Sequence, residues 1–180
     1  MEQMLNIALV GRAGSGKSTL AKKIAKEFDL VVIDSSMLKE YITNKKDGYE
    51  QMQKTMQCGG QVDEELLKKA LAIKVASNTS CKGFIWDNLY TIEGYNIAKE
   101  YFPINIAFYL EIDEQSANER LHDRCRNDFN KEFIQNRTKV FEENLPKLKE
   151  ALGARLYTIA ATISTIKVFS IAVKRISSLI

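Results

Sequence analysis

Short apolar runs alternate with longer amphipathic stretches along the whole chain. The apolar runs are rich in branched and aromatic side chains, a pattern that predicts buried parallel strands. These strands are expected over residues 5–10, 30–33, 83–86, 104–112 and 155–159. Because helical stretches separate them, the sequence predicts an α/β fold in which helices cover both faces of a five-stranded parallel sheet.

Between the strands, apolar residues recur three or four positions apart, as on the buried face of a helix. This spacing predicts helices from residue 17 onward, from about residue 37 onward, and over residues 49–58, 63–75, 114–126, 131–152 and 166–176. Asp34 and Asp63 each precede such a stretch and can cap it, whereas Pro146 should kink or break the helix that contains it. Three helices in a row after the second strand predict an excursion from the sheet.

A glycine-rich segment follows the first strand and opens the first helix. Its letters, GRAGSGKS from Gly11 onward, satisfy the phosphate-loop pattern GxxxxGK[ST]. Gly11, Gly14 and Gly16 allow the backbone to curve so that its amides point inward, and the first helical turn adds its own amides. We therefore expect this segment, which includes Ser15 and Thr19, to hold the phosphates of a nucleoside triphosphate.

Side chains at the end of this loop, and a carboxylate elsewhere, indicate metal-assisted chemistry. Lys17 is expected to bridge the β and γ phosphates of ATP, and the Ser18 hydroxyl to ligate Mg²⁺. A metal-bound phosphate also needs a carboxylate at the end of a neighbouring strand, and Asp87 is the first candidate. Asp34, after the second strand, competes for that role, and capping of a following helix is the alternative for Asp87.

Arginines cluster in the second half of the chain. Arg120, Arg124 and Arg126 lie within two turns of one predicted helix, and Arg137 lies on the next. Guanidinium groups that close over donor and acceptor phosphates stabilise the charge that phosphoryl transfer develops. The alternative is a solvated basic face paired with neighbouring carboxylates.

Composition limits the classes of function. The chain has 180 residues, 45% hydrophobic and 27% charged, which predicts a single domain over residues 1–180. A net charge of +3 is far below the basic load of a nucleic-acid binder, so a small anionic ligand is expected. No stretch is apolar enough to span a membrane, and three widely spaced cysteines form no disulfide framework. We expect a cytoplasmic monomer.

With these motifs the chain resembles the adenylate kinase and nucleoside-monophosphate-kinase family. Ser36-Met37-Leu38-Lys39 is similar to the start of that family's acceptor-binding helix, with Lys39 where an arginine usually grips the acceptor phosphate. Gly60-Gln61-Val62 is similar to the segment beside the acceptor base. Gly83-Phe84-Ile85-Trp86-Asp87 resembles the strand that carries the essential aspartate.

The resemblance continues through the second half of the chain. Residues 119–124 are similar to the helix that enters the lid, and Arg126 with Arg137 resembles the pair of arginines after it. This implies a three-layer αβα P-loop fold, with an acceptor-binding helical segment over about residues 34–66 and a short lid over about 124–130. The donor ATP would contact Arg120 and Arg124. The acceptor would contact Asp34, Lys39, Gln61, Val62, Arg126 and Arg137.

The segment after Asp87 departs from the family. The family has Gly-Phe-Pro-Arg-Thr there and, slightly later, a glutamine that reads adenine, whereas this chain has Asn88-Leu89-Tyr90-Thr91. A phosphate-gripping arginine and the adenine-reading amide are therefore missing. Because a buried polar group that matches its substrate discriminates strongly, these changes predict an altered acceptor or a loss of its recognition.

The sequence thus predicts an ATP- and Mg²⁺-dependent phosphotransferase that converts ATP and a nucleoside monophosphate into ADP and a nucleoside diphosphate. In-line transfer would use Lys17, Arg124 and Arg137 to stabilise charge, and Asp87 with Ser18 to organise the metal. Two alternatives stay open. One is a P-loop kinase of a non-nucleotide small molecule, and the other is an ATP-binding regulatory protein that does not transfer phosphate.

Overall fold

A single parallel sheet forms the centre of the protein, for which a computed structural model describes residues 4–45, 63–87, 89–123 and 131–180. Its strands are β1 (Ile7–Val10), β2 (Val31–Ile33), β3 (Phe84–Asp87), β4 (Ile106–Glu111) and β5 (Leu156–Ala160). They lie in the order β2-β3-β1-β4-β5, and every neighbouring pair is parallel. The predicted α/β class and five-stranded parallel sheet are confirmed. Because β1 lies at the centre, the loop after it lies at the middle of the sheet's carboxyl edge.

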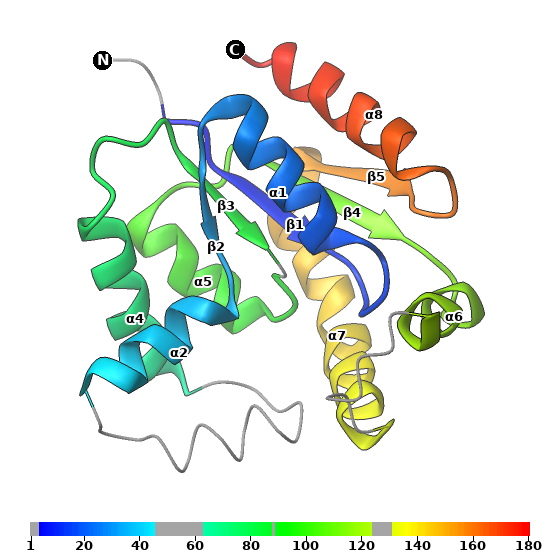
Figure 1. Cartoon of the computed structure of the whole chain (residues 1–180), viewed down its shortest axis with the longest axis horizontal. Coiled ribbons are helices and arrows are strands. Elements are labelled where there is room, and N and C mark those ends of the chain that lie inside the picture. Colours follow the sequence, from blue (N-terminus) through cyan, green and yellow to red (C-terminus); the bar gives the residue numbers. More distant parts are fainter. Residues whose placement is uncertain (1–3, 46–62, 88, 124–130) are drawn as a thin grey trace.

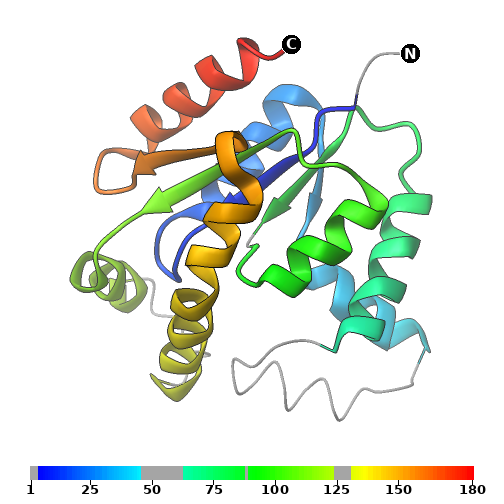
Figure 2. The ribbon, with the colours of Figure 1, turned by 180° about the vertical axis from the view of Figure 1, so that it is seen from behind.

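Helices cover both faces of this sheet. Figure 1 shows α1 (Lys17–Phe28) and α8 (Thr165–Ser177) on one face, and Figure 2 shows α5 (Ile92–Tyr101) and α7 (Lys131–Leu152) on the other. The 3₁₀ turn η1 (Gly153–Arg155) joins α7 to β5. This arrangement gives the three layers that the alternating pattern predicts.

Three further helices among the described residues lie around the carboxyl ends of the strands. Helix α2 (Ser35–Lys45) packs on α4 (Glu64–Ala76), which packs on α5, and α6 (Glu114–Asp123) follows β4. Asp63 caps α4 by accepting a hydrogen bond from the Leu66 amide at 2.9 Å, as predicted. The helix predicted over residues 49–58 lies outside the described residues. In the described part of the chain, no helix is long and apolar enough to cross a membrane.

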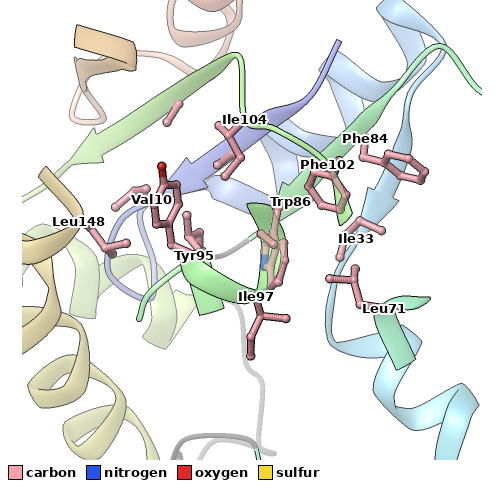
Figure 3. Close-up of a cluster of buried hydrophobic side chains, with 14 of the residues drawn as sticks. Val10, Ile33, Leu71, Phe84, Trp86, Tyr95, Ile97, Phe102, Ile104 and Leu148 are labelled. Atoms are coloured by element: carbon pink, nitrogen blue, oxygen red, sulfur yellow. The ribbon is translucent and has the colours of Figure 1, made fainter. Parts of the chain in front are cut away.

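Alternating side chains of the strands feed two apolar layers. Ala8 and Val10 of β1 point into the layer under α5 and α7, whereas Ile7 and Leu9 point into the layer under α1 and α8. Figure 3 shows the first layer, in which Phe84 and Phe102 stack with ring centroids 5.2 Å apart. All four β1 side chains are fully buried, so both layers fix the position of the loop that follows.

Two features of the helices differ from the prediction. Helix α5 was not predicted, although Thr91 is a good N-cap residue and its hydroxyl accepts a hydrogen bond from the Gly94 amide at 3.0 Å. A kink or a break was expected at Pro146, and the break is wrong, because α7 is one helix through that position. Phe141 and Leu148, on either side of the proline, are both buried in the same apolar layer.

Asn144 joins α7 to the start of α5. Its side chain is buried, its Oδ1 accepts a hydrogen bond from the Ile92 amide at 3.0 Å, and its Nδ2 donates to the Val140 carbonyl at 2.9 Å. Asn144→Ala is therefore expected to lower the free energy of unfolding by about 2 kcal/mol, because it leaves a buried amide without a partner. Urea denaturation measures this. The exposed Asn118→Ala on α6 is the control, and an equal effect of both changes would contradict this reading.

Candidate active site

The glycine-rich loop after β1 folds as a tight cup against α6. Gly14 has φ of +83°, and a Cβ added to it would lie 2.4 Å from the Ala117 carbonyl oxygen. Gly16 has φ of +95° and is the N-cap of α1. Both backbone conformations favour glycine, and Gly14 in addition leaves no room for a side chain. Gly11 opens the loop directly after the buried β1 strand.

The start of α1 presents backbone amides to the loop. The Leu20 amide makes the first helical hydrogen bond, to the Gly16 carbonyl at 3.0 Å. The Ser18 and Thr19 amides therefore lie ahead of that bond, at the positive end of the helix dipole. A phosphate group binds well at such a position.

Lys17 places its ammonium group inside the loop. The side chain is buried, and Nζ donates to the Gly11 carbonyl at 2.7 Å, to the Arg12 carbonyl at 2.8 Å and to Ser15 Oγ at 3.4 Å. These bonds hold the positive charge among the loop amides. An anion that enters the loop meets a cation that is already in place.

Asp87 ends β3 beside this loop. Its Cα pairs with that of Leu9 in β1, its side chain is only 8% exposed, and its Oδ1 is buried with no hydrogen-bond partner among the described residues. Burial raises the pKa of this carboxyl, and a hydrogen bond from Ser18 and the charge of Lys17 oppose the rise. A buried carboxylate oxygen without a partner is costly, so it indicates a ligand that the protein itself does not supply.

This oxygen and the Ser18 hydroxyl fit a hard divalent cation. Mg²⁺ prefers oxygen ligands, and in phosphate sites it takes one or two carboxylates together with phosphate oxygens and water. Within the described ranges, no group of three His, Cys, Asp or Glu side chains could hold a metal alone. A metal held by Ser18 and Asp87 would thus depend on the phosphates that the loop can bind.

Asp34, the competing carboxylate, has a structural function. Its Oδ1 accepts hydrogen bonds from the Ser36 hydroxyl and from the Ser36 amide, the latter at 2.8 Å, at the start of α2. Its charge still reaches Asp87 and contributes to the raised pKa of that carboxyl. The geometry therefore favours Asp87 over Asp34 as the metal ligand.

Arg137 approaches Asp87 from α7. Its guanidinium carbon lies 4.5 Å from the centre of the Tyr90 ring and 5.8 Å from that of Phe133. Burial lowers the pKa of Arg137, and the charges of Tyr90 and Asp87 oppose this change. A cation, a carboxylate and the phosphate loop thus meet at the carboxyl edge of the sheet.

A cavity opens on the other side of the loop. It is lined by Gly16 and Thr19 of the α1 start, by Arg120 of α6, and by Ile163 and Thr165 after β5. Arg120 donates from Nη2 to the Ala161 carbonyl at 2.7 Å, which ties α6 to the segment after β5. The Arg120 guanidinium thus lies at one wall of a small space next to the phosphate loop.

The remaining predicted residues are not all brought to this site. Lys39 is exposed on α2, and no described contact links its side chain to the phosphate loop. Gln61, Val62, Arg124 and Arg126 lie outside the described residues. Their assignments, and that of the short lid over residues 124–130, stay predictions.

Two parts of the site escaped the sequence analysis. Arg12, inside the loop, forms an ion pair with Glu142 of α7. Tyr90 carries the ring against which Arg137 stacks. No local pattern reveals either pair, because the partners are far apart in sequence and meet only when α7 packs beside the sheet.

Known proteins are similar to this chain over much of its length. Residues 10–135 match the family described as "AAA domain", a region that contains the phosphate loop and Asp87. The chain is 25% identical over 177 residues to a protein named adenylate kinase from Mycobacterium sp. (strain MCS), which covers 94% of this chain and 98% of that protein. It is 28% identical over 189 residues to an adenylate kinase from Azobacteroides pseudotrichonymphae genomovar. CFP2, which covers 98% and 99%. An adenylate kinase from Laccaria bicolor is 28% identical over 145 residues, 73% of this chain and 56% of that protein.

Proposed function

The chain belongs to the AAA domain family, and from this premise we propose that it is a nucleoside-monophosphate kinase that transfers the γ-phosphate of ATP to a nucleoside monophosphate. The observation that carries the proposal is the buried oxygen of Asp87, which lies beside Ser18 and Lys17 and has no hydrogen-bond partner in the described part of the chain. The similarity to proteins named adenylate kinase over nearly the whole chain supports it.

The site residues that the structure describes each have a role in this proposal. The loop amides and Lys17 would hold the donor phosphates, and Ser18 with Asp87 would hold Mg²⁺. When bound, Mg²⁺ would neutralise negative charge on the phosphate oxygens. Arg137 stabilises charge between donor and acceptor, and Arg120 with the segment after β5 holds the donor base.

The acceptor side of the proposal rests on α2 and on the undescribed segments. We assign the acceptor to the helical segment over residues 34–66, with Asp34 at its start and Lys39 on α2. By the resemblance to adenylate kinases, we assign further residues to the acceptor site. These are Gln61, Val62, Arg126 and the lid over residues 124–130, which carries Arg124. The whole chain acts as one kinase domain in this account.

One observation favours a second candidate, a P-loop kinase of a non-nucleotide small molecule. Thr91 lies near the place where the adenylate kinase family has its phosphate-gripping arginine. Its side chain is buried, and its hydroxyl accepts a hydrogen bond from the Gly94 amide. Thr91 therefore offers the acceptor neither charge nor a free hydroxyl. Compared with the adenylate kinase family, the acceptor phosphate therefore has one cation fewer around it. The second candidate is a kinase whose acceptor is not a nucleotide.

Product analysis across acceptors tests the proposal. Purified protein is incubated with Mg·ATP and, separately, AMP, CMP, UMP, GMP or dTMP, and the nucleotides are separated by ion-exchange chromatography. We expect equal amounts of ADP and one nucleoside diphosphate with at least one acceptor, and none with a Lys17→Ala preparation. ADP formation with metabolites but with no nucleotide acceptor would favour the second candidate. ATP binding without turnover on any acceptor would indicate a regulatory protein instead.

A further inference from the structure

The charged groups of Arg137 and Asp87 are arranged in an unusual way. A guanidinium close to a buried carboxylate ordinarily forms hydrogen bonds with it, because both groups lose water on burial. Arg137 lies close enough for its charge to act on Asp87. Oδ1 of Asp87 nevertheless accepts no hydrogen bond from Arg137 or from any other described residue. The two groups therefore act on each other through their charges without a hydrogen bond to this oxygen.

The Tyr90 ring is the feature that engages Arg137. The guanidinium carbon lies 4.5 Å from the ring centre, well inside the range of a cation–π contact, and the Phe133 ring lies on α7 at 5.8 Å. Arginine stacks on aromatic faces because its planar cation is weakly hydrated. The stacked position gives the guanidinium a favourable place that is not a hydrogen bond to Asp87 Oδ1.

Tyr90 is itself fixed on both sides. The preceding Leu89 is buried, and its amide donates to the Leu9 carbonyl of β1 at 2.9 Å. The following Thr91 caps α5, and the Asn144 side chain holds the next amide. The ring also packs against the apolar layer under α5 and α7. A ring held in this way can act as a rigid platform.

We propose that Tyr90 is a positioning residue that holds the Arg137 guanidinium away from the Asp87 carboxylate and so keeps that carboxylate open for a divalent cation. The inference rests on the proposed function, since it takes Asp87 as a metal ligand. Without the ring, the guanidinium is free to pair with Asp87. Such a pair competes directly with Mg²⁺ for the same oxygen.

Calorimetric titration of ADP, in Mg²⁺ and in EDTA, measures this effect without turnover. The quantity compared is the factor by which Mg²⁺ strengthens ADP binding. Tyr90→Leu is expected to reduce this factor by roughly three- to tenfold, the loss of one cation–π contact. Tyr90→Phe keeps the ring and is expected to keep the factor. Adding Arg137→Ala to Tyr90→Leu removes the competing cation and is expected to restore it.

The outcomes separate the proposed metal site from the positioning role of Tyr90. If Mg²⁺ does not strengthen ADP binding in the unchanged protein, the metal site and the proposed function fail together. If it does, but Tyr90→Leu leaves the factor unchanged, only the positioning role of Tyr90 is overturned. Loss in both Tyr90→Phe and Tyr90→Leu, or no recovery in the double variant, also overturns it. If Tyr90→Leu melts below the assay temperature, Tyr90→Met retains apolar bulk without the ring and takes its place.

Discussion

Replacing Lys17 by alanine is expected to lower the rate of phosphoryl transfer by roughly a thousandfold, the scale on which a cation at the transferring group acts. The structure gives the reason, since Nζ is buried and held by the Gly11 and Arg12 carbonyls at 2.7 and 2.8 Å. The change removes this charge from the centre of the loop. Initial rates with saturating acceptor, together with the affinity for Mg·ATP, measure the loss.

Lys22→Ala is the matched control for this experiment. Lys22 lies on the same helix but is exposed to solvent. We expect its replacement to leave the rate unchanged, while both variants keep the circular dichroism spectrum of the parent. A Lys17→Ala protein with the parental rate would remove the phosphate loop from the catalytic account.

Asp87→Asn is expected to lower the rate by at least about a hundredfold, because an amide is a poor ligand for Mg²⁺ and carries no charge. The same change should raise the thermal midpoint at neutral pH. The ionised carboxylate is buried, one of its oxygens has no hydrogen-bond partner among the residues that the structure describes, and burial raises the pKa of the group. A residue that costs stability but supports catalysis is typical of a functional site.

The pH dependence of this stability difference follows from the raised pKa of Asp87. Between the ordinary pKa and the raised one, the folded protein holds a proton that the unfolded chain lacks. The cost of burying the charge is therefore present above the raised pKa and is relieved as the pH falls through it. The advantage of Asp87→Asn should shrink over that interval, which thermal melts at a series of pH values measure.

Asp113→Asn gives the opposite sign and serves as the control. Hydrogen bonds from the Ser116 amide and hydroxyl lower the pKa of Asp113, so its charge contributes stability above the ordinary pKa. Asp113→Asn should therefore lower the thermal midpoint at neutral pH. An Asp87→Asn protein that is less stable than the parent at neutral pH would contradict our account of the buried carboxylate.

Local patterns made most of the fold predictable. The apolar runs stand out because a parallel sheet is covered on both faces, so its central strands are almost entirely apolar. The phosphate loop stands out because its glycines and Lys17 occupy fixed positions after a strand. Helix α5 was missed, since Gly94 puts no apolar side chain on its buried face, although Thr91 supplied a capping signal.

The arrangement of the site depends on contacts that no local pattern contains. Asp34 and Asp87 both lie at the carboxyl end of a strand. Only the hydrogen bonds from Ser36 distinguish the capping carboxylate from the one whose oxygen has no partner among the described residues. Arg137 meets Tyr90 only because α7 packs on the sheet beside α5. Tertiary packing therefore decides which of the charged residues belong to the candidate site.

Calorimetric titration of ATP into the folded protein tests the central claim most directly, namely that the segment after β1 holds Mg·ATP. We predict saturable binding of one ATP per chain that is tighter with Mg²⁺ than with EDTA. If well-folded protein gives no binding heat with Mg·ATP at any concentration tested, and equilibrium dialysis finds no bound nucleotide, the claim is wrong.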